Sequence, residues 1–165
     1  MVSDVKTKAH YKLESVTNET VTIKTESGSK GNWNKELNNP QPNKIYIVDG
    51  NKKYHTDHLG RVVRVEATLK LDKLDRNTYQ QLKAGKLGNA DDEGGHLIAS
   101  ILNGPGEKIN MLPMNSNLNR SLWKKLENEW VKSLKEGKTV EVKIEPIYKD
   151  TDIRPNKFRV LDRLH

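Results

Sequence analysis

The side chains in this sequence that are suited to chemistry gather between residues 91 and 127. His96 follows two glycines, and a polar loop then leads to Asn119 and Glu127 in a predicted helix. A neutral imidazole titrates close to working pH, so His96 can accept a proton from water. An asparagine oxygen is a weak ligand, but Mg²⁺ needs few protein ligands because it keeps several waters and takes phosphate oxygens from a substrate. The grouping predicts a phosphodiesterase that uses one metal ion.

A predicted helix positions two of these side chains. Apolar residues recur at four-residue spacing from residue 117, which indicates one amphipathic helix ending near Gly137. The stripe is Leu118, Leu122, Leu126 and Trp130, widened by Trp123 and Leu134. Asn119 and Glu127 are eight residues apart, which places them about two turns apart on neighbouring faces. Asn119 is then positioned to hold a hydrated magnesium ion, and Glu127 to accept hydrogen bonds from its waters.

The segment before His96 has more than one interpretation. Gly94 and Gly95 can take positive φ or allow a close approach, which predicts that His96 projects from a bend. A histidine alone in this setting is more often a buried structural residue, and the later Asn119 and Glu127 reverse that preference in favour of the catalytic interpretation. The acidic run at residues 91–93 predicts a solvated loop tip. In the alternative, one of its carboxylates holds the imidazole tautomer.

The rest of the chain predicts an α+β domain. The expected strands are a hairpin within residues 10–24, a second hairpin around Asp49-Gly50, and residues 61–71, 139–147 and 157–161. A short helix is expected from Asp75, as its N-cap, to residue 82, with Gly85 as its stop. Residues 26–44 are expected to form an extended loop in which Trp33 is an anchor rather than a base-stacking platform. The length of 165 residues fits one domain.

Two segments carry a resemblance to a known family. GGHLIA, followed by NMLPMNSNLNRSLWKKLE, resembles the DNA/RNA non-specific endonucleases of the ββα-metal superfamily. The resemblance is closest to the branch found as C-terminal toxin domains of bacterial secreted effectors, and it runs from about Tyr54 to Phe158. It implies a ββα-metal core with a mixed or antiparallel sheet and flanking helices. Residues 54–165 would form this core, with the strands and long loop of residues 1–53 packed on it as part of one domain.

The resemblance also implies roles for individual residues. His96 would be the general base, Asn119 the direct Mg²⁺ ligand, with Mn²⁺ as a substitute metal, and Glu127 the residue that orients metal-bound water. Many members of the family carry Asp-Arg-Gly-His where this chain has Glu-Gly-Gly-His at residues 93–96. The role of the missing arginine would pass to a lysine or to another arginine. The candidates are Arg76, Arg120 and Arg154.

Two of these arginines can be interpreted further. Arg76 is either a solvated charge at the start of a helix or a phosphate contact, because the arginine fork matches phosphate geometry. Arg154 precedes Pro155 in a rigid corner that could aim its guanidinium at the site.

Composition indicates the class of partner. The 29 Lys and Arg against 22 Asp and Glu give a net charge of +7, which favours a nucleic-acid partner, DNA or also RNA. The chain has no cysteine, which excludes disulfides and thiolate metal sites, and it has neither a signal-peptide run nor a membrane span. The toxin resemblance therefore implies export by a non-classical, type VII-like route within a longer effector that acts in the target-cell cytoplasm. It also implies a cognate immunity protein, expected to be acidic.

Two alternatives stay open at this level. His55 and His58 near Asp57 could form a transition-metal cluster, although paired ligands without a third are usually surface residues. The missing arginine also leaves open a nucleic-acid-binding module without catalytic activity.

Overall fold

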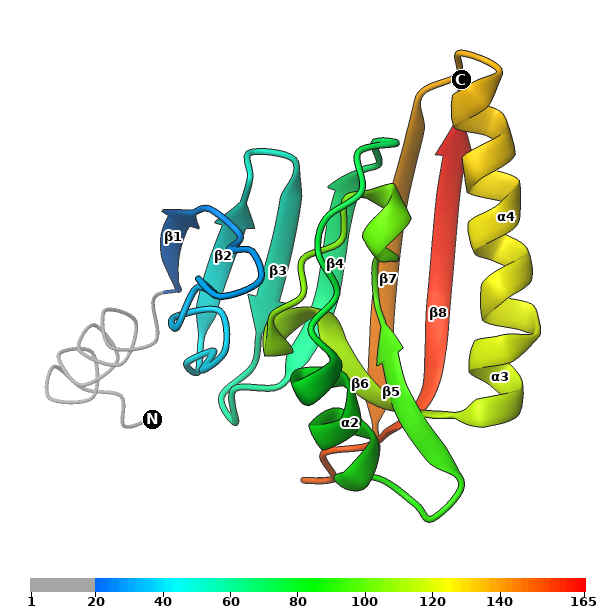
Figure 1. Cartoon of the computed structure of the whole chain (residues 1–165). Coiled ribbons are helices and arrows are strands. Elements are labelled where there is room, and N and C mark those ends of the chain that lie inside the picture. The colour runs from blue at the N-terminus through cyan, green and yellow to red at the C-terminus, as the bar shows by residue number, and fades with distance from the viewer. Residues whose placement is uncertain (1–19) are drawn as a thin grey trace, which may run out of the picture.

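A six-stranded sheet forms the body of the computed structural model, which describes residues 20–165 (Figure 1). Its strand order is β1-β2-β3-β4-β7-β8. The strands are β1 (Val21–Thr25), β2 (Lys44–Val48), β3 (Lys52–Thr56), β4 (Val62–Thr68), β7 (Val140–Tyr148) and β8 (Pro155–Leu164). β1 pairs parallel with β2, and every other pairing in this sheet is antiparallel. The predicted α+β class with a mixed sheet is therefore confirmed.

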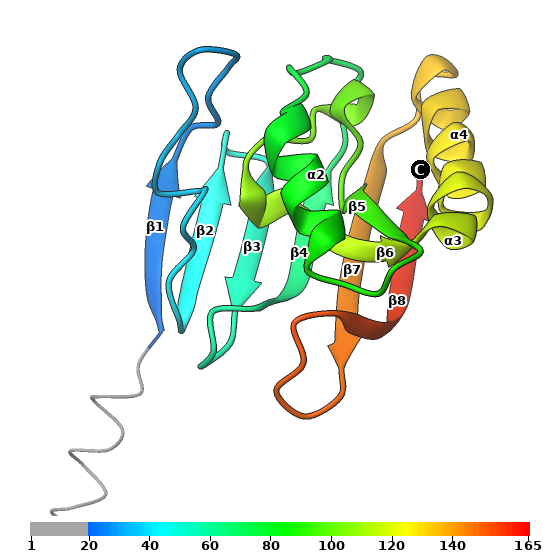
Figure 2. The same ribbon diagram turned by 60° about the horizontal axis from the view of Figure 1, so that its bottom comes forward.

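One face of this sheet carries the hydrophobic core. Successive side chains of a strand point to opposite faces, so alternate residues of the central strands are buried. The core residues from the sheet include Tyr46, Tyr54, Val65, Val142 and Ile144. Helix α4 (Leu122–Lys135) covers the β8 end of this face with Trp123 and Trp130, which are 3% and 1% exposed (Figure 2). Both tryptophans were expected in the core.

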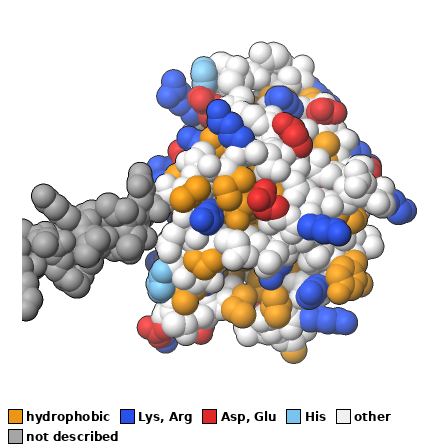
Figure 3. Space-filling model, turned by 90° about the vertical axis from the view of Figure 1, so that its left-hand side faces the viewer, with side chains coloured by type: hydrophobic (Ala, Val, Ile, Leu, Met, Phe, Trp, Pro, Cys, Tyr) orange, Lys and Arg blue, Asp and Glu red, His pale blue; other side chains and the backbone are white. Residues whose placement is uncertain are grey.

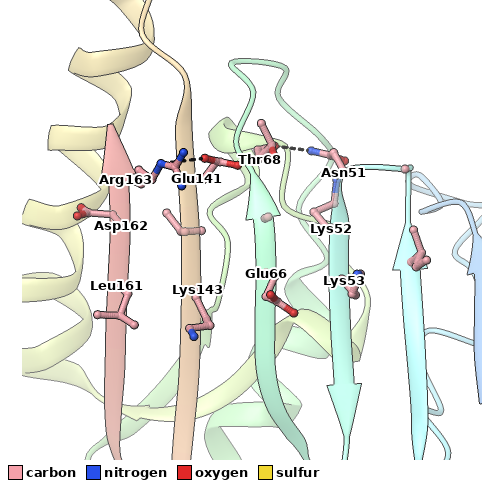
Figure 4. Close-up of a pocket in the computed structure, with 14 residues that line it drawn as sticks. Asn51, Lys52, Lys53, Glu66, Thr68, Glu141, Lys143, Leu161, Asp162 and Arg163 are labelled. Atoms are coloured by element: carbon pink, nitrogen blue, oxygen red, sulfur yellow. Dashed lines mark hydrogen bonds and ion pairs between the residues drawn. The ribbon is translucent and has the colours of Figure 1, made fainter. Parts of the chain in front are cut away.

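The opposite face of the sheet is polar and open. Lys53, Glu66 and Lys143 are paired in register across β3, β4 and β7, so opposite charges alternate across the strands. On the neighbouring strands β7 and β8, Glu141 and Arg163 are also paired in register and form an ion pair (Figure 4). Seen from the β1 side, Lys and Arg side chains are likewise interspersed with acidic and apolar ones (Figure 3). This face has the composition of a solvated surface.

A second, two-stranded sheet holds His96. β5 (Asp92–His96) pairs antiparallel with β6 (Met111–Asn115), and α2 (Thr78–Lys86) packs on β5. Gly94 and Gly95 are therefore in a strand and not in the predicted bend, and neither has a positive φ. A Cβ on Gly94 would lie 1.9 Å from the carbonyl oxygen of Gln81. Gly94 therefore serves the other purpose predicted for it, a close approach to the backbone, and the segment that approaches it is α2.

The helices differ from the sequence prediction in three places. The expected continuous helix is two helices, α3 (Ser116–Arg120) and α4, because Ser121 has φ −116° and ψ −86° and its hydroxyl donates to the Asn117 carbonyl. The break turns Leu122 outward, leaving it 64% exposed. The N-cap of α2 is Asn77 and not Asp75, and Gly85 lies inside this helix against Gly94.

The predicted strands mostly appear. The hairpin around Asp49-Gly50 is β2-β3, and residues 61–71, 139–147 and 157–161 correspond to β4, β7 and the middle of β8. The hairpin expected within residues 10–24 falls largely outside the described residues, and the described part, β1, pairs with β2 instead. Trp33 packs on Gly106, as expected for an anchor. Among residues 20–165, no helix has the length and apolar character needed to span a membrane.

Candidate active site

The three side chains selected first from the sequence line one cleft. This cleft has a volume of about 510 Å³ and includes His96, Asn119 and Glu127 in its wall. Other residues that line it are Lys73, Arg76, Gln81, Arg120 and Lys124. We call it the His96 cleft. It therefore combines one imidazole, oxygen ligands and several cations, which is the chemical composition needed to bind and attack a phosphodiester.

His96 is the last residue of β5 and is only 9% exposed. Its carbonyl accepts a hydrogen bond of 3.1 Å from Nε1 of Trp123, which fixes the start of α4 against β5. The ring nitrogen Nε2 is buried and has no hydrogen-bond partner among residues 20–165. Burial, followed by the charge of Arg76, lowers the pKa of His96 to about 4. The ring is therefore neutral at neutral pH and can accept a proton.

Asn119 is oriented by a carboxylate. Its Nδ2 donates to Oε1 of Glu93 at 2.8 Å, while the Arg120 Nη2 donates to Oε2 at 2.8 Å. Arg120 and then Asn119 lower the pKa of Glu93, so this carboxyl is ionised at neutral pH and can only accept. The amide nitrogen of Asn119 must face it. The amide oxygen has no donor within the described part of the chain, which leaves it available as a ligand.

Glu93 is thus a site residue that sequence reasoning did not select. The acidic run was expected to be a solvated loop tip, but Asp92 and Glu93 belong to β5 and pair with arginines. The side-chain hydrogen bonds of Asp92 and Glu93 within the described residues all go to groups other than His96, so neither of these carboxylates holds the imidazole tautomer. The available signal was the family resemblance given above, which aligns Glu93 with the first residue of Asp-Arg-Gly-His.

Glu127 lies one helical turn after Trp123 on α4. Residues four apart share a helix face, so the Trp123 contact with His96 also directs Glu127 into the cleft. Burial raises the pKa of Glu127 to about 7, against the opposing charges of Lys124 and Arg76. No hydrogen bond or ion pair from residues 20–165 reaches its carboxyl. A cation bound in the cleft would stabilise the ionised form of this carboxyl further.

We expect this carboxyl to reduce stability at alkaline pH. Because its pKa is raised from 4.5 to about 7, the folded state holds the proton longer than the unfolded state, and stability falls as pH rises through this window. Glu127→Gln should therefore be more stable than the wild type at pH 8, by about 1–3 kcal/mol, and equal to it below pH 4.5. Urea unfolding in EDTA at both pH values measures this. Glu129→Gln, at an exposed position of the same helix, is the control, and an equal gain in both variants would contradict the prediction.

The three candidate arginines have different surroundings. Arg120 lines the cleft but is 76% exposed and bound to Glu93. Arg154 does not line the cleft, because its Nη2 donates to Oδ1 of Asp92 at 3.0 Å, so the rigid corner aims it at the start of β5. Arg76 lines the cleft and makes only a 3.3 Å hydrogen bond to Gln81, with no carboxylate partner among residues 20–165. Of the three, Arg76 is the one whose charge is not neutralised.

The conceivable transition-metal cluster is absent from the described residues. His55 pairs with Glu66 at 2.9 Å, and Asp57 pairs with Arg61 at 2.8 Å. Within residues 20–165 no group of three His, Cys, Asp or Glu side chains could hold a metal ion. His55 is half-buried and His58 is exposed. Lys73 and Lys124 were not selected from the sequence, because single lysines in a basic chain carry no pattern.

Comparison with known proteins agrees with this site. The family model described as DNA/RNA non-specific endonuclease matches residues 42–164. The chain is also similar to "Type VII secretion system protein EssD" of Staphylococcus aureus strains USA300 and NCTC 8325 / PS 47, with 36% identity over 115 residues. That alignment covers 65% of this chain and 19% of the relative, so the chain spans about a fifth of the length of these curated relatives. Since the family model matches more than half of the chain, the protein belongs to the DNA/RNA non-specific endonuclease family and is a nuclease that cleaves phosphodiester bonds.

Proposed function

We propose that this chain is a Mg²⁺-dependent endonuclease that cleaves DNA, and also RNA, without sequence preference. The observation that carries the proposal is the meeting of His96, Asn119 and Glu127 in one cleft, although 23 residues separate the first two in sequence. Family membership supports the reaction class, since the family is that of the metal-dependent non-specific nucleases.

The residues of the cleft fit a hard divalent cation. The available amide oxygen of Asn119 would be its direct ligand, and the half-buried carboxyl of Glu127 would accept hydrogen bonds from its hydration waters. Oxygen atoms are the donors that Mg²⁺ prefers, and Mn²⁺ accepts the same set. When bound, the cation supplies Lewis-acid stabilisation of the charge that develops on the phosphate and on the departing 3′ oxygen.

The protein's own residues carry the proton and the charge. His96 accepts a proton from the attacking water, because its ring is neutral at neutral pH. Arg76 donates hydrogen bonds to the non-bridging phosphate oxygens. It thereby replaces the arginine of the Asp-Arg-Gly-His pattern, which is Gly94 in this chain. Arg120 acts indirectly, because it holds Glu93, and Glu93 orients Asn119.

Digestion assays test the reaction class and the metal. Linear DNA and RNA are incubated with the purified chain in Mg²⁺, in Mn²⁺ and in EDTA. We expect fragmentation of both substrates with either metal and none in EDTA. The alternative of an inactive nucleic-acid-binding module predicts salt-dependent DNA binding without cleavage under any of the three conditions. Fragmentation of DNA alone would restrict the proposal to a DNase.

A matched pair of variants tests the arginine. Arg76→Gln should lower kcat/KM for DNA by about 10²-fold, because an unpaired guanidinium is removed from the developing charge. Arg154→Gln removes an equally charged side chain that is bound to Asp92 outside the cleft. We expect it to cost stability and to leave kcat of the folded enzyme within about threefold of the wild type. Equal losses of kcat in both variants would contradict the proposal that Arg76 stabilises the charge developing on the phosphate.

The biological role is a further part of the proposal. Similarity to the staphylococcal type VII secretion system protein supports a nuclease that is secreted by a type VII-like route as the C-terminal part of a longer effector. We propose that it acts as an antibacterial toxin in the target-cell cytoplasm and is held inactive in the producer by an acidic immunity protein. The net charge of +7 and the cationic cleft favour such a partner. Co-expression with each neighbouring open reading frame should identify one that relieves toxicity. If none of them relieves it, the proposal of an immunity protein is contradicted.

A further inference from the structure

A second groove adjoins the His96 cleft. It runs between α2 and the segment that leads into β5, and it has a volume of about 780 Å³. Arg76 and Gln81 line both cavities, so the two lie next to each other. We call this the α2 groove. The proposed reaction uses two of its lining residues, Arg76 and Glu93, and leaves the rest of the groove without a role.

The groove has the charge pattern of a site for a polyanion. Its acidic groups, Asp92 and Glu93, are neutralised by Arg154 and Arg120. Its basic groups, Arg76 and Lys86, have no carboxylate partner within residues 20–165, and they lie just before the start and at the end of α2. An anion in the groove therefore meets unpaired cations and no unpaired carboxylate.

The lining between these ends is suited to sugars and bases. Leu82 contributes an apolar side chain that is 66% exposed, unusual for a leucine in the middle of a helix, and Ala90 lies in the same wall. Gln81 and Asn89 supply amides that can donate and accept hydrogen bonds. No aromatic side chain lines the groove, so it offers no stacking platform and little means of selecting a base.

Residues from Thr78 to Lys86 line the groove, so the length of α2 sets the scale of the nucleic acid that it can hold. From Thr78 to Lys86 the helix rises about 12 Å at 1.5 Å per residue. One strand of B-form DNA carries a phosphate about every 3.4 Å along the axis. The groove can therefore accommodate about three nucleotides.

We propose that the α2 groove binds the run of about three nucleotides on one side of the scissile phosphate. Arg76, which holds the scissile phosphate, lies where the groove meets the His96 cleft, and Lys86 binds the far phosphate of the run. This inference rests on the proposed nuclease function. It adds a substrate subsite that contributes affinity but takes no part in the bond-breaking step.

Lys86 and Lys83 provide a matched test. Both lie in the last turn of α2, so replacing either with glutamate has the same effect on net charge and on the helix dipole, but only Lys86 lines the groove. Binding is measured by fluorescence anisotropy in the His96→Ala background with Mg²⁺. The probes are oligonucleotides extended stepwise in the 5′ or the 3′ direction from a dinucleotide core.

The expected outcomes separate the subsite from general electrostatics. Affinity should increase with extension in one direction and level off after about three nucleotides. Lys86→Glu should abolish the gain in affinity from the outermost nucleotide and so weaken binding of the longest probe about fivefold or more. Lys83→Glu should change the affinity for that probe less than about twofold. Equal effects of the two substitutions, or affinity that does not depend on extension in either direction, would overturn the proposal.

A small substrate distinguishes failure of the subsite from failure of the proposed function. Bis(p-nitrophenyl) phosphate has no nucleotides to occupy the groove, so Lys86→Glu with His96 intact should hydrolyse it at the wild-type kcat/KM. A comparable loss on this substrate would show that Lys86 acts on the cleft itself and would overturn the subsite. If the wild-type chain cleaves neither this diester nor DNA, the nuclease function fails, whatever the binding measurements show.

Discussion

Replacement of His96 by alanine is expected to lower kcat for DNA cleavage by about 10²- to 10⁴-fold, the range typical of a positioned general base. The fold should survive. The buried ring nitrogen makes no hydrogen bond with the described residues, and the Trp123 indole is bonded to the His96 backbone rather than its side chain. Binding to DNA should therefore be retained while cleavage is nearly lost.

Plasmid degradation in Mg²⁺, together with circular dichroism and DNA-binding measurements, checks this expectation. His58→Ala is the control, because His58 is exposed and lies outside the cleft. Degradation by a folded His96→Ala variant at a near-wild-type rate would defeat the assignment of the base. A variant that fails to fold would be replaced by His96→Asn, which keeps a polar group of similar size in the strand.

Replacement of Asn119 by alanine is expected to affect metal use. The Mg²⁺ concentration required for half-maximal activity should rise by at least about tenfold. The substitution removes the proposed direct ligand and leaves His96 and Arg76 in place. Asn117→Ala is the matched control, because Asn117 is an exposed asparagine of the same helix and does not line the cleft. If the Asn119→Ala variant needs the same Mg²⁺ concentration as the wild type, Asn119 is not a metal ligand.

Metal binding can also be measured without catalysis. Calorimetric titration of Mn²⁺ in the His96→Ala background should show weaker binding when Asn119→Ala is added. Glu93→Gln should show an intermediate loss, because a glutamine can present either its oxygen or its nitrogen to Asn119 and no longer dictates which way the amide faces. Full metal affinity in the Glu93→Gln variant would mean that Glu93 does not orient the ligand.

Much of this site could be identified from the sequence. The types and order of His96, Asn119 and Glu127 are local facts, and they predict the kind of chemistry without any coordinates. Strand alternation and helical spacing predicted most of the regular elements for the same reason, since a periodic pattern records which side of an element faces the core. Helix limits differed at Ser121 and Asn77, where a side-chain hydrogen bond to the backbone decided the local geometry. The strands β5 and β6 were not predicted, because the glycines of β5 indicated a bend.

The remaining properties belong to the tertiary structure. Glu93 meets Asn119 across 26 residues and Arg120 across 27, and Asp92 meets Arg154 across 62. The two ion pairs leave Arg76 as the candidate arginine with no carboxylate partner among residues 20–165. Desolvation sets the raised pKa of Glu127 and most of the lowered pKa of His96. The sequence alone determined which functional groups this protein has and the order in which they occur. Which of them face one another, and in what charge state, was decided by folding, because burial and long-range pairing arise only when distant segments pack together.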